Sequence, residues 1–321
     1  MELIVAREQS LFLSTRTPTC PPGLIERAQL YPKPRIAIAG AGGISSMAAA
    51  KDATLLDIMI PIFIGKKELI KSEATALDWD IDSFEIIDVD GEVQIGLTAA
   101  KICGDGGADI LMKDQIHSDI FIKSALDKSS GLRTGRRLIH IFHISHPDGG
   151  RPILISDAAV NILPGSKTRK EIAREIVRVL RIIGTQNPKV AVLSATEVPN
   201  PAMASSIEAR ELVEWCSDNI KGAEFSGPLA LDTILSCQSS KIKGIEGDQV
   251  VGQADAIIVP DIVSGNTLFK ALVYLSAGCA AGVVTGAKVP LLLTSRADPP
   301  AARLASIALA AQICGNTQIN N

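Results

Sequence analysis

Val289-Pro-Leu-Leu-Leu-Thr-Ser-Arg-Ala-Asp-Pro-Pro-Ala-Ala-Arg-Leu-Ala-Ser306 joins a short apolar run to a segment that two adjacent prolines can open as a helix. The run Val289–Leu293 predicts a buried strand. Ser295, Arg296 and Asp298 follow it, at the kind of strand-to-helix junction where open α/β sheets bind ligands. Free N–H groups and the helix dipole favour an anion there, and the planar fork of arginine matches phosphate oxygens. The stretch therefore predicts an α/β fold with a phosphate site.

Asp298 also has a structural interpretation in which it serves as the helix N-cap and Pro299 takes the first helical position. The sequence alone leaves both interpretations of Asp298 open. No cap requires the neighbouring pair Ser295 and Arg296, so the functional interpretation is stronger for them.

Composition limits the partners that the chain can have. Its 321 residues, 46% of them hydrophobic, can bury a large core, and the length favours two domains. A net charge of −3 gives no general attraction to DNA or anionic membranes, and 3% aromatic residues leave few platforms for stacking bases. We expect no nucleic-acid partner and no membrane partner.

The cysteines and the hydropathy predict where the protein works. Its six cysteines are scattered and form no C-x-x-C pair, which favours a reducing compartment. Residues 1–7 lack the pattern of a signal peptide, and no apolar run reaches the ~18 residues that a membrane helix needs. We expect a cytoplasmic protein.

Apolar strands alternate with amphipathic helices along the chain. The predicted strands are Arg35–Ala39, Ile60–Ile64, Ala108–Leu111, Leu138–Ile144, Pro152–Ser156, Lys189–Ser194 and Ala256–Val259. The predicted helices are Ser45–Leu56, Asp119–Asp127, Thr168–Ile183, Ser205–Asp218, Leu229–Lys241 and Asn266–Ala277. Such alternation argues for parallel sheets covered on both faces. We expect two α/β domains around a central cleft, formed by residues 1–147 with 285–321 and by residues 148–284.

A glycine-rich turn, Ile38–Ser46, follows the first strand and partly matches a dinucleotide fingerprint. Gly40 and Gly42 fit, but Ser45 stands at the third glycine position. The second strand ends in Gly65-Lys66-Lys67, with no acid for a ribose hydroxyl, although the lysines could hold a 2′-phosphate. NADP is therefore an alternative, and close packing of helix on strand is the favoured reason for the glycines.

His140, His143 and His146 have a spacing that invites a metal interpretation. Residues three apart on a strand point to opposite faces, and no nearby cysteine or carboxylate completes a set of ligands. We predict no metal site.

Other polar residues gather next to predicted strands. The segment Gly131–Arg137 carries three arginines, including Arg133, and is either a phosphate clamp or a solvated turn. Asn266 and Lys270 follow Gly265, which we expect to open a helix, and Glu197 follows the strand Lys189–Ser194. We expect Glu197, Asn266 and Lys270 to face the cleft.

Ten motifs occur in an order that resembles one enzyme family. They are Ala108–Lys113, Gly131–Gly135, Ser156–Asn161, Pro188–Ala191, Ser226–Asp232, Lys243–Ile245, Gly252–Asp255, Val259–Asp261, Gly265-Asn266 and Thr294–Asp298. Over residues 36–315 the chain resembles the phosphate acetyltransferase and phosphate butyryltransferase family. The resemblance implies an isocitrate-dehydrogenase-like superfold and a homodimer. It also implies the reaction acyl-CoA + phosphate = acyl phosphate + CoA, by direct attack of the CoA thiolate in a ternary complex.

The resemblance also implies roles for single residues. Ser295 would serve the transition state, and Arg296 would bind the phosphoryl group. Some relatives place an aspartate base seven residues after that serine, where this chain has Ala302. The base is then Asp298, Glu197 or no protein group at all. The expected substrate-binding residues are Lys123, Arg133, Asn266, Lys270, Glu197 and His117.

Three functions are compatible with these features. The first is the phosphate acyltransferase, with coenzyme A as a substrate and with no cofactor or metal. The second is an NADP-linked hydroxyacid dehydrogenase of the related fold. The third is a catalytically weak homologue that binds CoA, suggested by Ala302. Acetyl, propionyl and butyryl groups all remain open, as does the physiological direction.

Overall fold

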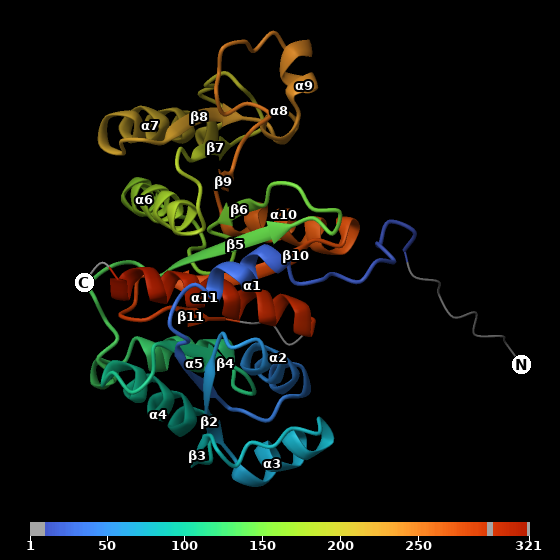
Figure 1. The fold of residues 1–321 in the computed structure, drawn as a ribbon. Helices are drawn as coiled ribbons and strands as arrows, with labels where there is room; N and C mark the ends of the chain where they lie inside the picture. Colours follow the sequence, from blue (N-terminus) through green and yellow to red (C-terminus); the bar gives the residue numbers. More distant parts are fainter. Residues whose placement is uncertain (1–9, 294–297, 320–321) are drawn as a thin grey trace, which may run out of the picture.

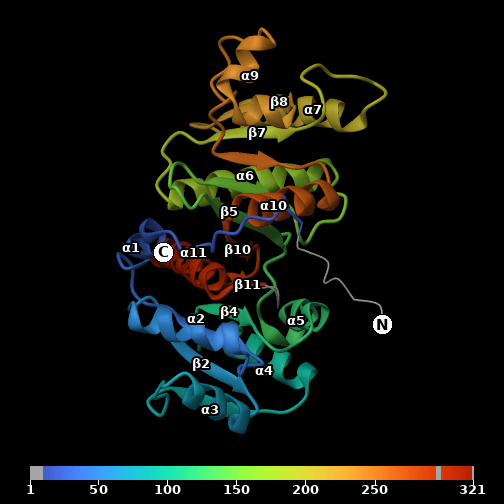
Figure 2. The ribbon, with the colours of Figure 1, turned by 90° about the vertical axis from the view of Figure 1, so that its right-hand side faces the viewer.

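The computed structural model describes residues 10–293 and 298–319 (Figure 1). Within these residues, eleven strands form one sheet in the order β3-β2-β1-β4-β11-β10-β5-β6-β9-β7-β8. The strands are β1 (Arg35–Ala39), β2 (Ile60–Gly65), β3 (Glu85–Asp88), β4 (Ile110–Lys113), β5 (Ile139–Ser145), β6 (Ile153–Ser156), β7 (Lys189–Leu193), β8 (Glu224–Leu229), β9 (Ala256–Ile258), β10 (Cys279–Thr285) and β11 (Leu291–Leu292). Figure 2 shows the strands stacked through the whole length of the molecule, with helices beside them.

The sheet is mixed, where the sequence predicted parallel sheets. The strands β3, β2, β1, β4 and β11 pair in parallel, as do β6, β9, β7 and β8. Between these groups, β10 is antiparallel to both β11 and β5, and β5 is antiparallel to β6. A central strand is apolar because helices cover both of its faces, so its composition does not reveal its direction.

Helices cover both faces of the sheet. They are α1 (Pro22–Ala28), α2 (Ile44–Leu55), α3 (Lys67–Ala76), α4 (Glu92–Gly104), α5 (Ser118–Ala125), η1 (Lys128–Ser130), α6 (Ser166–Ile182), α7 (Ala204–Asn219), α8 (Leu231–Leu235), α9 (Cys237–Ile242), α10 (Ile262–Ser276) and α11 (Pro300–Ile319). No helix in the described ranges is long and apolar enough to cross a membrane.

The two faces of the sheet differ in how their cores are connected. On one face α1, α2, α3, α6, α7 and α11 contribute to a single hydrophobic core. On the other face one cluster lies under α4 and α5, and a separate cluster lies under α10 and α8. The second face is therefore divided between two apolar clusters.

The last strand and helix lie beside elements from the beginning of the chain. Leu291 and Leu292 of β11 pair with β4, and α11 packs against α2, β10 and α1. The sheet runs without a break across the boundary that we predicted at residues 147 and 148. The division into two domains stays a prediction.

Two helix starts differ from the predictions in ways that affect the candidate site. α10 begins at Ile262, and the Asp261 side chain caps it by accepting a hydrogen bond from the Ser264 N–H at 2.8 Å. Gly265 does not open the helix but lies inside it. A Cβ on Gly265 would come within 2.9 Å of Val259 and Ala158, so the glycine permits close packing.

The start of α11 corrects the proposed cap. The carbonyl of Pro299 accepts the hydrogen bond from the Ala302 N–H at 3.0 Å, so Pro299 is the N-cap residue and Pro300 takes the first helical position. Asp298 therefore lies one residue before the cap. The interpretation of Asp298 as the cap itself was wrong.

Candidate functional site

Four of the predicted site residues line one cavity of about 470 Å³. They are His117, Asn266, Lys270 and Asp298. His117 is the residue before α5, while Asn266 and Lys270 lie on consecutive turns of α10. The fold thus brings together residues that are more than 100 positions apart in the sequence.

The cavity lies where several strands end. Lys113 is the last residue of β4, Leu293 follows β11, Ala159 lies after β6, and α10 follows β9. Its apolar wall combines Ile116 and Leu293 from the cluster under α5 with Phe142 and Phe269 from the cluster under α10. The gap between the two apolar clusters is the expected position for a ligand in an open α/β sheet.

A second cavity of about 490 Å³ adjoins the first and shares Phe269, Lys270 and Asp298 with it. The rest of its wall comes from residues 13–18, α10, the start of β10 and the start of α11: Leu13, Ser14, Arg16, Pro18, Val273, Tyr274, Gly278, Ala280, Pro299 and Ala302. Asp298 thus lies between the cavity at Lys113 and the cavity at Ala302. Ala302, where the family resemblance implied an aspartate, lines the second cavity.

Lys113 lines the cavity but is not among the site residues predicted from the sequence. Its side chain is almost fully buried, and its ammonium group donates to the backbone carbonyl of Asp114 at 3.3 Å. A buried cation is costly unless charged or polar groups face it. The sequence signal that could have identified Lys113 is its position as the charged last residue of an otherwise apolar strand.

His140 is the second such residue. Its imidazole is buried on β5 against Phe142, and Nδ1 has no hydrogen-bond partner among the described residues. Burial lowers the pKa of His140 to about 4, against an opposing effect of the Asp157 carboxylate. The ring is therefore neutral at physiological pH.

The glycine-rich turn holds a carboxylate of the chain itself. Asp114 accepts a hydrogen bond from the Gly43 N–H at 2.8 Å, at the N-terminus of α2. A Cβ on Gly43 would collide with the Asp114 carboxylate and the Gln115 amide, which explains the glycine. A pyrophosphate would need the same position. This arrangement argues against the dinucleotide interpretation of residues 38–46.

Arg303 connects this turn to the start of α11. Its guanidinium is buried, donates to Ser46 Oγ at 2.6 Å and to the carbonyl of Asp298 at 3.3 Å, and interacts with the Asp114 charge. Burial raises the pKa of Asp114, and hydrogen bonds from Gly43 and Ser46 oppose that rise. Arg303 therefore holds the backbone at Asp298 beside the cavity.

The remaining predicted residues lie elsewhere. Lys123 is exposed on α5 and pairs with Asp119, Arg133 is exposed before β5, and Glu197 pairs with Lys243 beside a different cavity. None of these three lines the cavity at Asp298. Ser295 and Arg296 lie outside the described residues. Their assignments, like those of all the site residues, stay predictions.

His117 has a carboxylate partner. Its Nδ1 lies 2.7 Å from Glu92 Oε2, and its backbone N–H donates to the same oxygen at 2.8 Å. Among the described residues no group of three metal-ligating side chains is placed to hold a metal ion.

The two buried histidines of β5 predict a pH-dependent stability. Burial lowers the pKa of both His140 and His143 from 6.5 to about 4. Between these values only the unfolded chain binds the protons, so the free energy of unfolding falls as the pH drops from 6.5 toward 4. The expected loss at pH 5 is about 2 kcal/mol for each histidine.

Urea unfolding at neutral pH and at pH 5 measures this loss. His143→Gln removes one titrating group away from the cavity and should reduce the difference by about half. A wild-type protein as stable at pH 5 as at neutral pH would show that the histidines are not buried in neutral form.

Comparison with known proteins identifies the family of the chain. Residues 92–311 match the family described as "Phosphate acetyl/butaryl transferase". The chain is 35% identical to a phosphate butyryltransferase of Clostridium acetobutylicum over 88% of its own length and 94% of the relative's. It is 36% identical to a phosphate acetyltransferase of Thermotoga maritima over 90% of its own length and 97% of the relative's.

A solved structure shares the fold. The crystal structure of a branched-chain phosphotransacylase from Enterococcus faecalis V583 superposes with a TM-score of 0.77 at 29% identity. The similarity covers 87% of this chain and 98% of the other. The chain belongs to the phosphate acetyl/butyryltransferase family.

Proposed function

We propose that the protein transfers an acyl group between coenzyme A and phosphate: acyl-CoA + phosphate = acyl phosphate + CoA. The family and the names of its relatives support this reaction. The observation that carries it is the cavity where Lys113, Lys270 and Asn266 meet Asp298. Two cations and an amide beside a carboxylate suit a phosphoryl group next to a reacting thiol.

The proposed mechanism is a direct transfer. In the direction that consumes acyl phosphate, the CoA thiol loses its proton and its sulfur attacks the acyl carbonyl carbon. The bond from that carbon to the phosphate oxygen then breaks. Lys113, Lys270 and Arg296 stabilise the charge on the departing phosphate, and Asn266 or Ser295 donates to the carbonyl oxygen. Asp298 accepts the thiol proton.

The cysteines support a mechanism without an enzyme thiol. Burial raises the pKa of five of them to about 12: Cys20, Cys103, Cys216, Cys279 and Cys314. A protonated, buried thiol is a poor nucleophile. Cys237 is exposed on α9 and lines neither cavity at Asp298.

The cavity that Ala302 lines suggests the acyl preference. Leu13, Phe269, Val273 and Ala302 form an apolar part of its wall, beside Arg16 and Lys270, and this part suits a chain of about four carbons better than an acetyl group. We infer that the enzyme prefers butyryl-CoA or a branched analogue. The phosphate would then occupy the cavity at Lys113 and the acyl chain the cavity at Ala302.

Ala302→Leu tests this preference. The larger side chain reduces the room for a long acyl group, so kcat/KM for butyryl-CoA should fall relative to acetyl-CoA by about tenfold or more. Ala204→Leu, at an exposed alanine of α7, is the matched control and should leave the ratio unchanged. An equal loss with both substrates would assign the cavity at Ala302 to another part of the substrate.

The activity itself is tested with a thiol reagent that detects free CoA. Acyl-CoAs with about two to six acyl carbons should release CoA only when phosphate is present. A change in nicotinamide absorbance with a hydroxy acid would favour the dehydrogenase alternative. Calorimetry that showed CoA binding without turnover would favour the weak homologue. The homodimer, the cytoplasmic location and the two-domain superfold stay predictions.

A further inference from the structure

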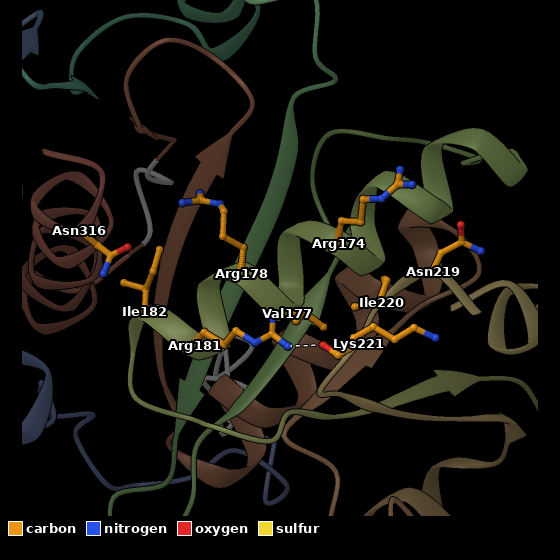
Figure 3. Close-up of a pocket in the computed structure, with 9 residues that line it drawn as sticks. All are labelled: Arg174, Val177, Arg178, Arg181, Ile182, Asn219, Ile220, Lys221 and Asn316. Atoms are coloured by element: carbon orange, nitrogen blue, oxygen red, sulfur yellow. Dashed lines mark hydrogen bonds between the residues drawn. The ribbon is translucent and has the colours of Figure 1, made fainter. Parts of the chain in front are cut away.

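A second group of cations surrounds a cavity away from Asp298. This cavity, of about 480 Å³, lies between α6, the end of α7 and the end of α11 (Figure 3). Arg174, Arg178 and Arg181 come from α6, and Lys221 follows α7. Their spacing of four and three residues along α6 puts the three arginines on one side of the helix. Among the described residues that line it, none is acidic.

An adjoining cavity of about 510 Å³ extends this group. It shares Arg178 and Asn316 with the first and adds Arg136 and Lys288. Its described lining residues include no aspartate or glutamate either. We call the two together the basic cavity. It carries six cationic side chains in a chain whose net charge is −3.

One carboxylate offsets part of this charge. Glu175 is buried, and its oxygens accept hydrogen bonds from Arg136 at 2.6 Å and from Arg178 at 2.5 Å and 2.9 Å. Burial alone would raise the pKa of Glu175, but the two arginines outweigh it and lower the pKa, so Glu175 is ionised. Six cations and this carboxylate leave five positive charges.

The other cations contact uncharged groups. Arg181 donates to the carbonyls of Lys221 at 2.5 Å and Gly222 at 3.0 Å, as Figure 3 shows for the first. Lys288 donates to the Gly104 carbonyl, and Arg174 lies 4.6 Å from the centre of the Trp215 ring. These contacts orient the side chains without neutralising their charge.

The basic cavity is remote from the candidate active site. Asp298 lies just before the start of α11, whereas Asn316 lies near the end of that helix. The two residues are 18 positions apart, which at a helical rise of 1.5 Å per residue corresponds to about 27 Å. Figure 1 shows α11 crossing the middle of the molecule toward the C-terminus.

We propose that the basic cavity binds a small molecule with two or more linked phosphate groups. Arginine forks match phosphate oxygens, and five positive charges exceed what a single phosphate balances. Val177, Ile182 and Ile220 provide an apolar floor, and Asn219 and Asn316 provide amides for an attached organic group. This site is separate from the phosphate and CoA of the proposed reaction.

Isothermal titration calorimetry with inorganic triphosphate tests the proposal. The wild-type protein should bind one triphosphate at this site, and orthophosphate about tenfold or more weakly. The double variant Arg174→Gln/Lys221→Gln removes two charges that do not contact Glu175. It should weaken triphosphate binding by about tenfold or more.

Two controls locate the binding. Arg35→Gln/Lys101→Gln removes the same charge from exposed ion pairs elsewhere and should change the affinity less than about twofold. Lys113→Met alters the candidate active site and should leave this binding unchanged. Absence of saturable binding, equal weakening by the control pair, or loss of binding in Lys113→Met would overturn the proposal. The readout is independent of turnover, so it does not depend on the proposed reaction.

Discussion

Replacing Lys113 with methionine is expected to lower kcat/KM for phosphate-dependent acyl transfer by about 10²–10³-fold, because a buried cation stabilises developing charge far better than an exposed one. Lys113 is almost fully buried at the end of β4 and lines the cavity with Lys270 and Asp298. Methionine keeps much of the apolar stem but removes the charge. Steady-state kinetics with phosphate as the varied substrate measure the loss.

Lys123→Met is the matched control. Lys123 was the lysine that the family resemblance selected, yet it is exposed on α5 and pairs with Asp119. Exposed pairs contribute little, so this variant should lose no more than about twofold in kcat/KM. Lys113→Arg should recover part of the activity, since it restores the cation. Full activity in Lys113→Met together with a large loss in Lys123→Met would reverse the assignment.

Arg303→Met is expected to lower the free energy of unfolding by about 3 kcal/mol, since removing one partner of a buried charge network leaves the other without compensation. Arg303 interacts with the buried Asp114 carboxylate, donates to Ser46 and holds the Asp298 carbonyl. Burial lowers the pKa of Arg303, and the charges of Asp114 and Asp298 oppose that effect. Urea unfolding of the variant and the wild type measures the change.

The same substitution at an exposed pair provides the control. Arg35 contacts Glu85 at 3.1 Å with both side chains about half exposed, so Arg35→Met should cost less than about 1 kcal/mol. If Arg303→Met and Arg35→Met both lower the free energy of unfolding by the same small amount, the network between α2, β4 and α11 does not stabilise the fold as described. Turnover should also fall in Arg303→Met, because Asp298 loses the group that positions its backbone.

The sequence predicted the local elements well where one physical signal dominated. The apolar run at residues 189–194 is β7, and the periodic apolar residues of the predicted helix Thr168–Ile183 are buried in α6. The predicted parallel direction was wrong in the middle of the sheet, where β10 and β5 pair with their neighbours in antiparallel fashion. β10 pairs with β5, whose residues lie more than 130 positions earlier, and no local pattern reports such a pairing.

The sequence predicted only part of the site, because local signals reveal some of its residues and distant contacts determine others. Asn266 and Lys270 follow a strand closely, and strand ends meet at one place in such sheets. The role of the glycine-rich turn was missed because the carboxylate at Gly43 belongs to Asp114, which is 71 positions away. The spacing of His140 and His143 correctly predicted that their side chains point to opposite faces of the strand. It did not indicate that both faces are buried.

The most direct test of the central claim measures both products in one reaction. Butyryl-CoA and phosphate are incubated with the enzyme, free CoA is detected with a thiol reagent, and acyl phosphate is trapped with hydroxylamine. The proposed transfer predicts one acyl phosphate for each CoA and no release of either without phosphate. CoA release without acyl phosphate would indicate thioester hydrolysis and contradict the assignment.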